Sequence, residues 1–267
     1  MVRRFGRHPE DITRQFPAVT MTEHGIFRLL PEFVMRSIPT LLARGLRRCL
    51  GPAVPPRLRL AFNYQLAQLD GCEPELALLH QLGPNRGTAI DAGANEGLFT
   101  YRLSTLYNRV HAFEINPTLA DRLRRLVPSK VSVYPVGLSS REGSGTLYTP
   151  YYRGRPLHGW AGLEPWNCPT AERYTESVVS VRRLDSFGFD DVAFLKVDVE
   201  GHELELLTGA QQTIRRNRPV VLIEVKDRNR AAVGDYFRDL RYAERRLEDL
   251  TGVSGSTENY VYLPDPT

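Results

Sequence analysis

The sequence predicts an α/β fold: a mostly parallel seven-stranded sheet with helices on both faces, preceded by an N-terminal helical extension. Short apolar segments alternate with longer amphipathic ones from residue 88 to residue 240, which is typical of a parallel sheet covered on both sides. A glycine-containing turn, Thr88–Gly97, ends the first apolar segment and opens a helical pattern. In such folds, ligands bind at the carboxyl ends of the strands.

Turn and capping residues predict where the elements begin and end. Asn116 and Pro117 are a helix cap and a favoured first helical residue, and Gly83–Gly87 ends a helix. The expected strands are 88–92, 109–114, 131–136, 178–184, 192–198, 219–225 and 261–263, and the expected helices are 74–82, 97–107, 117–127, 202–216 and 229–240.

The first 60 residues differ in charge from the rest. They hold 11 arginines and four acidic residues, a net charge of +7, whereas the remainder carries −3. The apolar, arginine-containing stretch 26–50 predicts two short helices, which either contact a membrane surface or pack on the main domain or a second subunit of a homo-oligomer. Gly51–Pro56 is the expected linker. We therefore expect a basic helical extension at 1–56 and a main domain at 57–267.

Composition also indicates the compartment. The three cysteines are far apart and form no Cys-x-x-Cys pair, which argues against a disulfide scaffold and a zinc site. No signal peptide and no apolar stretch of about 18 residues is recognisable. These features predict a cytoplasmic protein. The mildly acidic main domain, without an Asp/Asn-Pro-Pro-Tyr/Phe motif, argues against nucleic acid as a partner.

The strand–helix alternation stops between residues 139 and 190. A short strand is expected at 146–149, but 150–177 is rich in Tyr, Arg, Gly, Pro and Trp and has no apolar period. Long irregular segments of this kind usually act as lids or binding loops, so we expect it to fold over the carboxyl ends of the strands. Its aromatic residues can stack on a sugar or fix the loop to the sheet; they are Tyr151, Tyr152, Trp160 and Trp166.

The glycine turn departs from the dinucleotide pattern Gly-x-Gly-x-x-Gly, because Asn95 stands between Gly93 and Gly97. Asp91 precedes the first glycine, and Glu114 closes the second strand. A carboxylate there can accept hydrogen bonds from both ribose hydroxyls, and Asp91 can orient an ammonium group directly or through water. S-adenosylmethionine has the ribose, the adenine and the charged tail that fit. The alternative is a purely structural turn beside a surface acid.

A second motif ends the strand at 192–198. Asp198 directly follows the apolar run, and Glu200 lies two residues further on, before a helix. Acidic residues stabilise helix N-termini, but this does not explain an acid directly after a buried strand. The two carboxylates are therefore expected beside the glycine turn.

Five blocks, in this order, closely resemble the FkbM-type methyltransferases. They are 90–97, 112–117, 184–187, 195–203 and 209–210, spread over about residues 75–225. The resemblance implies a class I Rossmann-like methyltransferase that uses S-adenosylmethionine, usually on a hydroxyl of a sugar or polyketide. The family often has Glu-Pro-x-Pro where Ile115 and Asn116 follow Glu114 here, so the chain departs from the family pattern where adenosine contacts are expected. The expected cofactor-binding residues are Asp91, Gly93, Asn95, Glu96, Gly97, Glu114, Ile115, Gly137 and Asp198.

Methylation of an alcohol needs a base, or a metal that lowers the pKa of the hydroxyl. The candidate bases are Asp198, His158 in the irregular segment and His202 at the start of a helix. The resemblance also makes Mg²⁺ a candidate, with Asp198 and Glu224 as ligands at the ends of adjacent strands and Glu200 as a further one. A metal-free site with Asp198 as the base is the alternative.

These expectations converge on an S-adenosylmethionine-dependent O-methyltransferase acting on a hydroxyl of a saccharide or glycolipid. Two alternatives stay open. The acceptor is instead a polyketide or another lipid-like natural product, or the chain is a non-catalytic S-adenosylmethionine-binding module. The acids Asp91, Glu114, Asp198 and Glu200 are all present, which argues against the last alternative.

Overall fold

The computed structural model describes residues 50–70, 75–165, 168–246, 249 and 258–266. The chain divides into two compact units, 1–38 and 39–267, and all of these residues belong to the second. The expected helices at 26–50 lie outside the described residues, apart from Leu50. The expected linker forms a 3-10 turn, Gly51–Ala53, that leads into helix α3, Pro56–Asp70. The domain boundary at residue 56 remains a prediction.

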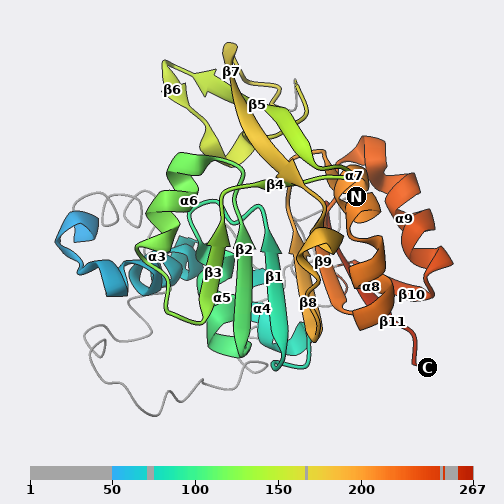
Figure 1. Ribbon diagram of the computed structural model, residues 1–267. Helices are drawn as coiled ribbons and strands as arrows, with labels where there is room; N and C mark the ends of the chain where they lie inside the picture. Colours follow the sequence, from blue (N-terminus) through green and yellow to red (C-terminus); the bar gives the residue numbers. More distant parts are fainter. Residues whose placement is uncertain (1–49, 71–74, 166–167, 247–248, 250–257, 267) are drawn as a thin grey trace, which may run out of the picture. The chain divides into compact units, whose positions relative to one another are not determined.

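A seven-stranded sheet forms the centre of the second unit, in the order β10-β11-β9-β8-β1-β2-β3 (Figure 1). Its strands are β1 (Thr88–Ala92), β2 (Arg109–Phe113), β3 (Val131–Tyr134), β8 (Val192–Val197), β9 (Val220–Glu224), β10 (Tyr242–Arg246) and β11 (Asn259–Pro264). Only β11 runs antiparallel to its neighbours, β9 and β10. The expected class I, Rossmann-like sheet is confirmed.

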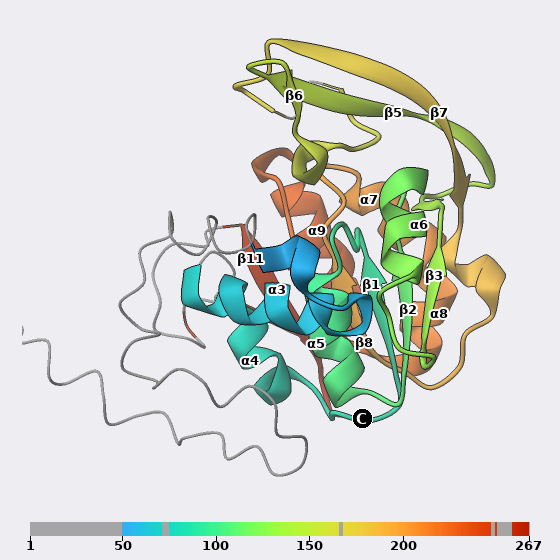
Figure 2. The same cartoon turned by 90° about the vertical axis from the view of Figure 1, so that its left-hand side faces the viewer.

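Each face of the sheet has its own apolar core. Helices α3, α4 (Glu75–Leu82), α5 (Leu98–Leu106) and α6 (Pro117–Arg124) cover one face, and Figure 2 shows α3, α4 and α5 lying together. Helices α7 (Glu203–Gly209), α8 (Gln211–Asn217) and α9 (Arg230–Asp239) cover the other. Because side chains alternate along a strand, Ala89 joins the first core and its neighbour Ile90 joins the second.

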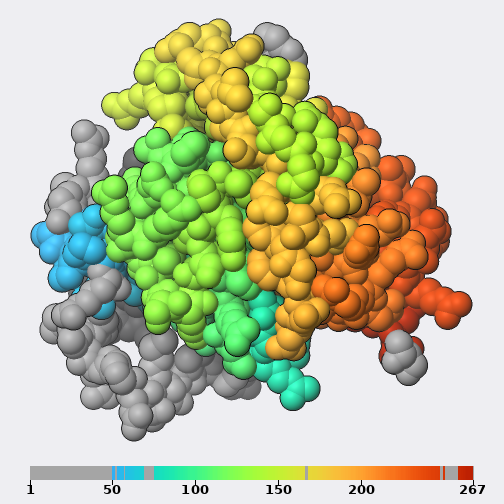
Figure 3. All heavy atoms as spheres, viewed as in Figure 1, coloured from blue at the N-terminus to red at the C-terminus, as the bar shows by residue number. Residues whose placement is uncertain are grey.

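Both ends of the segment expected to be irregular, 150–177, contribute to a second sheet, so that expectation is wrong for 150–152, 155–156 and 173–177. The strands are β4 (Gly137–Leu138), β5 (Gly143–Tyr152), β6 (Arg155–Pro156) and β7 (Arg173–Arg182), in the order β4-β7-β5-β6. Tyr, Thr and Val are frequent in β5 and β7, and these residues suit a pleated surface. The second sheet packs over one end of the central sheet (Figures 1 and 3).

Three other elements differ from expectation. The helix expected at 202–216 is interrupted at Ala210, which separates α7 from α8. Neither α3 nor β10 was anticipated, because charged residues within both segments obscure an apolar period. Among the helices of the described segments, none has both the length and the apolar character that spanning a membrane requires.

Candidate functional site

The glycine turn brings the ends of two strands into direct contact. Gly93 adopts a left-handed conformation with φ of +84°, and a Cβ atom there would lie 1.8 Å from the backbone carbonyl oxygen of Asp198. The amide of Asp198 in turn donates to the carbonyl of Ala92 at 3.0 Å. Only glycine permits this approach. The turn after β1 and the acidic motif after β8 therefore form one site, as the sequence predicted.

Glu114 is held in place by the turn itself. Its Oε2 accepts a hydrogen bond from the Asn95 amide at 2.6 Å, and its Oε1 accepts one from the Asn116 amide at 2.8 Å. The side chain is buried, and burial raises the pKa of Glu114 while the two amides oppose that rise. A carboxylate oxygen can accept more than one hydrogen bond, so both oxygens keep acceptor capacity for a ligand.

A cavity of about 600 Å³, including space open to solvent, separates the glycine turn from the second sheet. It brings together most of the residues predicted for the cofactor and all three candidate bases. These are Gly93, Asn95, Glu114, Ile115, Gly137, Asp198, His158 and His202. Of the other predicted residues, Glu96 borders a smaller neighbouring pocket, and Gly97 precedes helix α5 without lining the cavity.

Asp91 lies one layer behind the cavity. It is fully buried, and its Oδ2 accepts a hydrogen bond from Thr100 Oγ1 at 2.5 Å. Burial raises the pKa of Asp91, while the charge of Lys196, whose Nζ lies 3.9 Å from Oδ1, opposes the rise. Lys196 also donates to Asp198 Oδ2 at 3.0 Å. This buried lysine, to which no role was given beforehand, connects the two acidic motifs.

The three predicted metal ligands do form a cluster, but the ammonium group of Lys226 lies within it. Asp198, Glu200 and Glu224 each have a carboxylate oxygen within 4.8 Å of the others. The Nζ of Lys226 lies 2.5 Å from Glu224 Oε1 and 3.3 Å from Glu200 Oε2. Burial, as the main cause, and the charge of Asp198, as the second cause, raise the pKa of Glu200 to about 8 and the pKa of Glu224 to about 7. Two of the three carboxylates thus already bind an ammonium group, so this set fits a divalent ion poorly.

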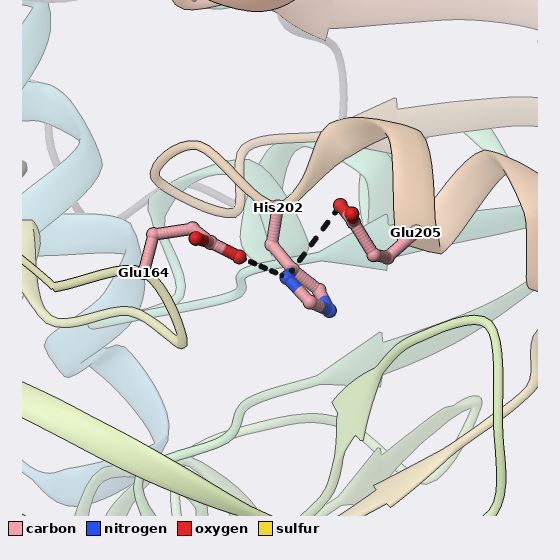
Figure 4. Close-up of side chains that lie close together, drawn as sticks. All are labelled: Glu164, His202 and Glu205. Carbon is pink, nitrogen blue, oxygen red and sulfur yellow. Dashed lines mark hydrogen bonds and ion pairs between the residues drawn. The ribbon is translucent and has the colours of Figure 1, made fainter.

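His202 is already bonded through both ring nitrogens. Its Nδ1 lies 2.7 Å from Glu164 Oε1 and its Nε2 lies 2.9 Å from Ser139 Oγ, while Glu205 is 3.7 Å away (Figure 4). Glu164 lies in the segment that follows the 3-10 helix η3, His158–Trp160. This contact between the irregular segment and α7 was not foreseen, because nothing in the local sequence marks Glu164.

The segment 157–165, hereafter the lid, borders the cavity. His158 lines the cavity, and its Nδ1 lies 3.5 Å from Asn116 Nδ2. The lid is attached to β5 by the backbone hydrogen bonds between Tyr148 and Gly162. Trp160 remains 41% exposed. His111, in contrast, stacks on Phe189 at 4.0 Å and does not line the cavity.

Comparison with known proteins gives the site a family. A family model described as the Methyltransferase FkbM domain matches residues 91–248, more than half of the chain. Methyltransferase sdnD of Sordaria araneosa is 30% identical over 163 residues, which are 48% of this chain and 62% of that protein. The chain thus spans less than two thirds of that relative.

Two solved structures are similar at lower identity. Methyltransferase FkbM from Methylobacillus flagellatus KT is 15% identical with a TM-score of 0.46, over 83% of this chain and 59% of that chain. A Streptococcus mutans protein in complex with SAH is 15% identical with a TM-score of 0.44, over 71% of this chain and 94% of that chain. The family match itself includes Glu114 and the motif around Asp198. The chain therefore belongs to the FkbM methyltransferase domain family.

Proposed function

We propose that the protein is an S-adenosylmethionine-dependent O-methyltransferase that acts on a hydroxyl group of a saccharide or glycolipid. The observation that carries the proposal is Glu114, a buried carboxylate that two backbone amides fix at the edge of the cavity. A carboxylate in this position suits a ribose diol rather than a phosphate. Membership of the FkbM family supports the methyl donor.

The residues around the cavity fit the parts of S-adenosylmethionine. Glu114 would bind the ribose hydroxyls, and the apolar edge formed by Ile115 and residues 136–138 would border the adenine. Gly93 and Asn95 would face the amino-acid tail, with Asp91 supporting the turn from behind. Bound there, the cofactor supplies a methyl group on a positively charged sulfur. The protein then has to align an acceptor oxygen with that methyl group.

Asp198 is the base that we assign to the acceptor hydroxyl. It lines the cavity, and Lys196 holds its Oδ2, which leaves Oδ1 for a proton. His158 is the second candidate, because it reaches the same cavity from the lid. His202 has both nitrogens engaged, so we assign it the role of holding Glu164 and the lid.

The surroundings of Trp160 favour a saccharide acceptor. Its half-exposed ring lies beside Lys226, next to Glu200 and Glu224. An aromatic face with adjoining carboxylates suits a polyhydroxylated ring, which has an apolar face and hydroxyl donors at its edge. A polyketide alcohol, with fewer hydroxyls, would use fewer of these groups.

Calorimetry with S-adenosylmethionine and S-adenosylhomocysteine tests the donor site. We expect micromolar binding by the unaltered chain and about 10- to 100-fold weaker binding by Glu114→Ala, which loses the hydrogen bonds to the ribose and leaves two loop amides without their acceptor. Glu142→Ala is the matched control, since Glu142 pairs with Arg182 in the second sheet. Absence of binding by the unaltered chain, or equal affinity in Glu114→Ala, contradicts the proposal.

Mass spectrometry tests the acceptor. Glycolipid, polysaccharide and polyketide-type lipid fractions are incubated separately with the protein and S-adenosylmethionine. We expect a gain of one CH₂ unit in a saccharide-containing fraction, and Asp198→Asn should abolish it. A gain confined to polyketide-type lipids would select the alternative acceptor. Cofactor binding without methylation of any fraction would instead indicate a binding module.

A further inference from the structure

Lys226 places a positive charge among the carboxylates beside the cavity. Its Nζ lies 2.5 Å from Glu224 Oε1, 3.0 Å from Glu258 Oε2 and 3.3 Å from Glu200 Oε2. These acids come from three different segments: the end of β9, the residue before β11 and the turn after β8. The lysine side chain is only 18% exposed.

We propose that Lys226 is the resident cation of the acceptor site, and that it positions Glu200 and Glu224 where a divalent metal ion would otherwise be required. The identity of the acceptor rests on the proposed function. The placement of the cation does not, because it follows from the contacts of Lys226 alone.

The chemistry of the contacts favours the ammonium over a metal ion. Lys226 has three N–H donors and no acceptor, and it meets three carboxylates. Mg²⁺ needs a near-octahedral set of oxygens at about 2.0–2.1 Å. An ion held by Glu200 and Glu224 would lie beside the ammonium and be repelled by it. Binding of the metal and the present position of Lys226 therefore exclude each other.

Lys226 also connects the sheet with the lid. Its Nζ lies 5.3 Å from the centre of the Trp160 ring, within the range of a cation–π interaction. Trp160 belongs to η3, whose residues His158 and Gly159 line the cavity. A change of charge at Lys226 should therefore affect the lid as well as the two carboxylates.

The conformation of Glu200 agrees with this positioning role. Its φ is +53°, in the left-handed region that residues other than glycine seldom adopt. The turn holds the side chain toward Lys226 and the cavity. With Lys226 in contact, Glu200 and Glu224 remain hydrogen-bond acceptors for the hydroxyls of an acceptor, without a metal between them.

The test uses the full chain with Lys226→Met, which shortens the unbranched side chain by one atom and removes its charge. Mn²⁺ binding is followed by the electron paramagnetic resonance of the free ion. We expect the unaltered chain to bind Mn²⁺ at least about tenfold more weakly than Lys226→Met, in which the carboxylates are free to take the ion. Acrylamide quenching of Trp160, in a Trp166→Phe background, should increase in the same variant because the lid loses its cation.

Lys130→Met is the matched control. Lys130 lies at the other end of the central sheet, before β3, where its Nζ donates to the carbonyl of Tyr107. It should leave both readouts unchanged, and Lys226→Arg should restore both. If circular dichroism shows that Lys226→Met does not fold, Lys226→Gln takes its place in both measurements.

Two results would overturn the inference. One is stoichiometric Mn²⁺ binding by the unaltered chain that Glu224→Gln abolishes. The other is a folded Lys226→Met or Lys226→Gln variant with unchanged Mn²⁺ binding and quenching. Calorimetry with S-adenosylmethionine on the same samples reports separately on the proposed function. If the chain does not bind the cofactor, the Mn²⁺ binding and the quenching still test the role of Lys226.

Discussion

Gly93 illustrates how one residue determines the distance between two motifs. A side chain there would meet the carbonyl oxygen of Asp198, and the left-handed backbone adds a second cost for any other residue. The glycine turn and the proposed base are therefore linked through a position that has no side chain. Substitution at Gly93 should disturb both at once.

We expect Gly93→Ala to lower the free energy of unfolding by about 2–4 kcal/mol and to weaken S-adenosylmethionine binding more than about tenfold, because the strand ends must separate. Denaturant unfolding and calorimetry measure the two effects. The control is Gly154→Ala, at a φ of +70° with no atom within 4 Å of the added Cβ. It should cost only about 1 kcal/mol, from backbone strain alone, and leave binding unchanged. Equal effects of the two substitutions would show that the contact with Asp198 is unimportant.

At the scale of elements, the lid is attached by side chains from different parts of the chain. Glu164 bonds to His202 at the start of α7, and Trp160 lies over Lys226 after β9. The second sheet supports the lid from the other side through β5. Each of these attachments depends on one or two side chains or on a short run of backbone, so each side-chain attachment can be removed by a single substitution.

Glu164→Ala should loosen the lid, because it removes the 2.7 Å contact with His202. Limited proteolysis should then cleave within 157–172 several-fold faster than in the unaltered chain. Glu142→Ala removes an exposed ion pair between the turn before β5 and the end of β7, away from the lid. It should leave the cleavage rate unchanged, and a similar acceleration in both variants would indicate a general loss of stability instead.

For the whole molecule, the cluster of Asp198, Glu200 and Glu224 makes the free energy of unfolding depend on pH. The pKa of Glu200 is raised to about 8 and that of Glu224 to about 7, chiefly by burial, from the ordinary value of 4.5. A raised carboxyl pKa means that the folded state favours the protonated form. The stabilisation that the protonated Glu200 and Glu224 contribute is therefore complete below about pH 4.5, and it is lost as the pH rises through 7 to 8.

Without cofactor, we expect the free energy of unfolding to fall by about 1–3 kcal/mol between pH 5 and pH 8. Denaturant titrations at several pH values measure this slope. Glu224→Gln should flatten it by removing one of the titrating groups, while Glu142→Gln should not. A slope that is the same in all three proteins would assign the pH dependence to other groups.

Some of the site could be predicted because it depends on neighbouring residues and on one property of parallel sheets. Gly93 and Asp198 directly follow their strands, and Asn95 comes two residues after Gly93. The ends of β1, β2 and β8 meet because adjacent parallel strands end at the same edge. Glu114 and Asn95 are therefore close although 19 residues separate them. Three of the five FkbM-type blocks, 90–97, 112–117 and 195–203, lie in these same local segments.

The sequence by itself thus determined six of the seven strands of the central sheet, the glycine turn and the acids at the strand ends, since these follow from periodicity and adjacent residues. Only the tertiary structure decided the second sheet, the attachment of Glu164 to His202 and the place of Lys226. Lys226 and Glu258 are 32 residues apart, and Glu164 and His202 are 38 apart. Such contacts leave no period in the sequence, because they depend on how irregular segments pack against one another.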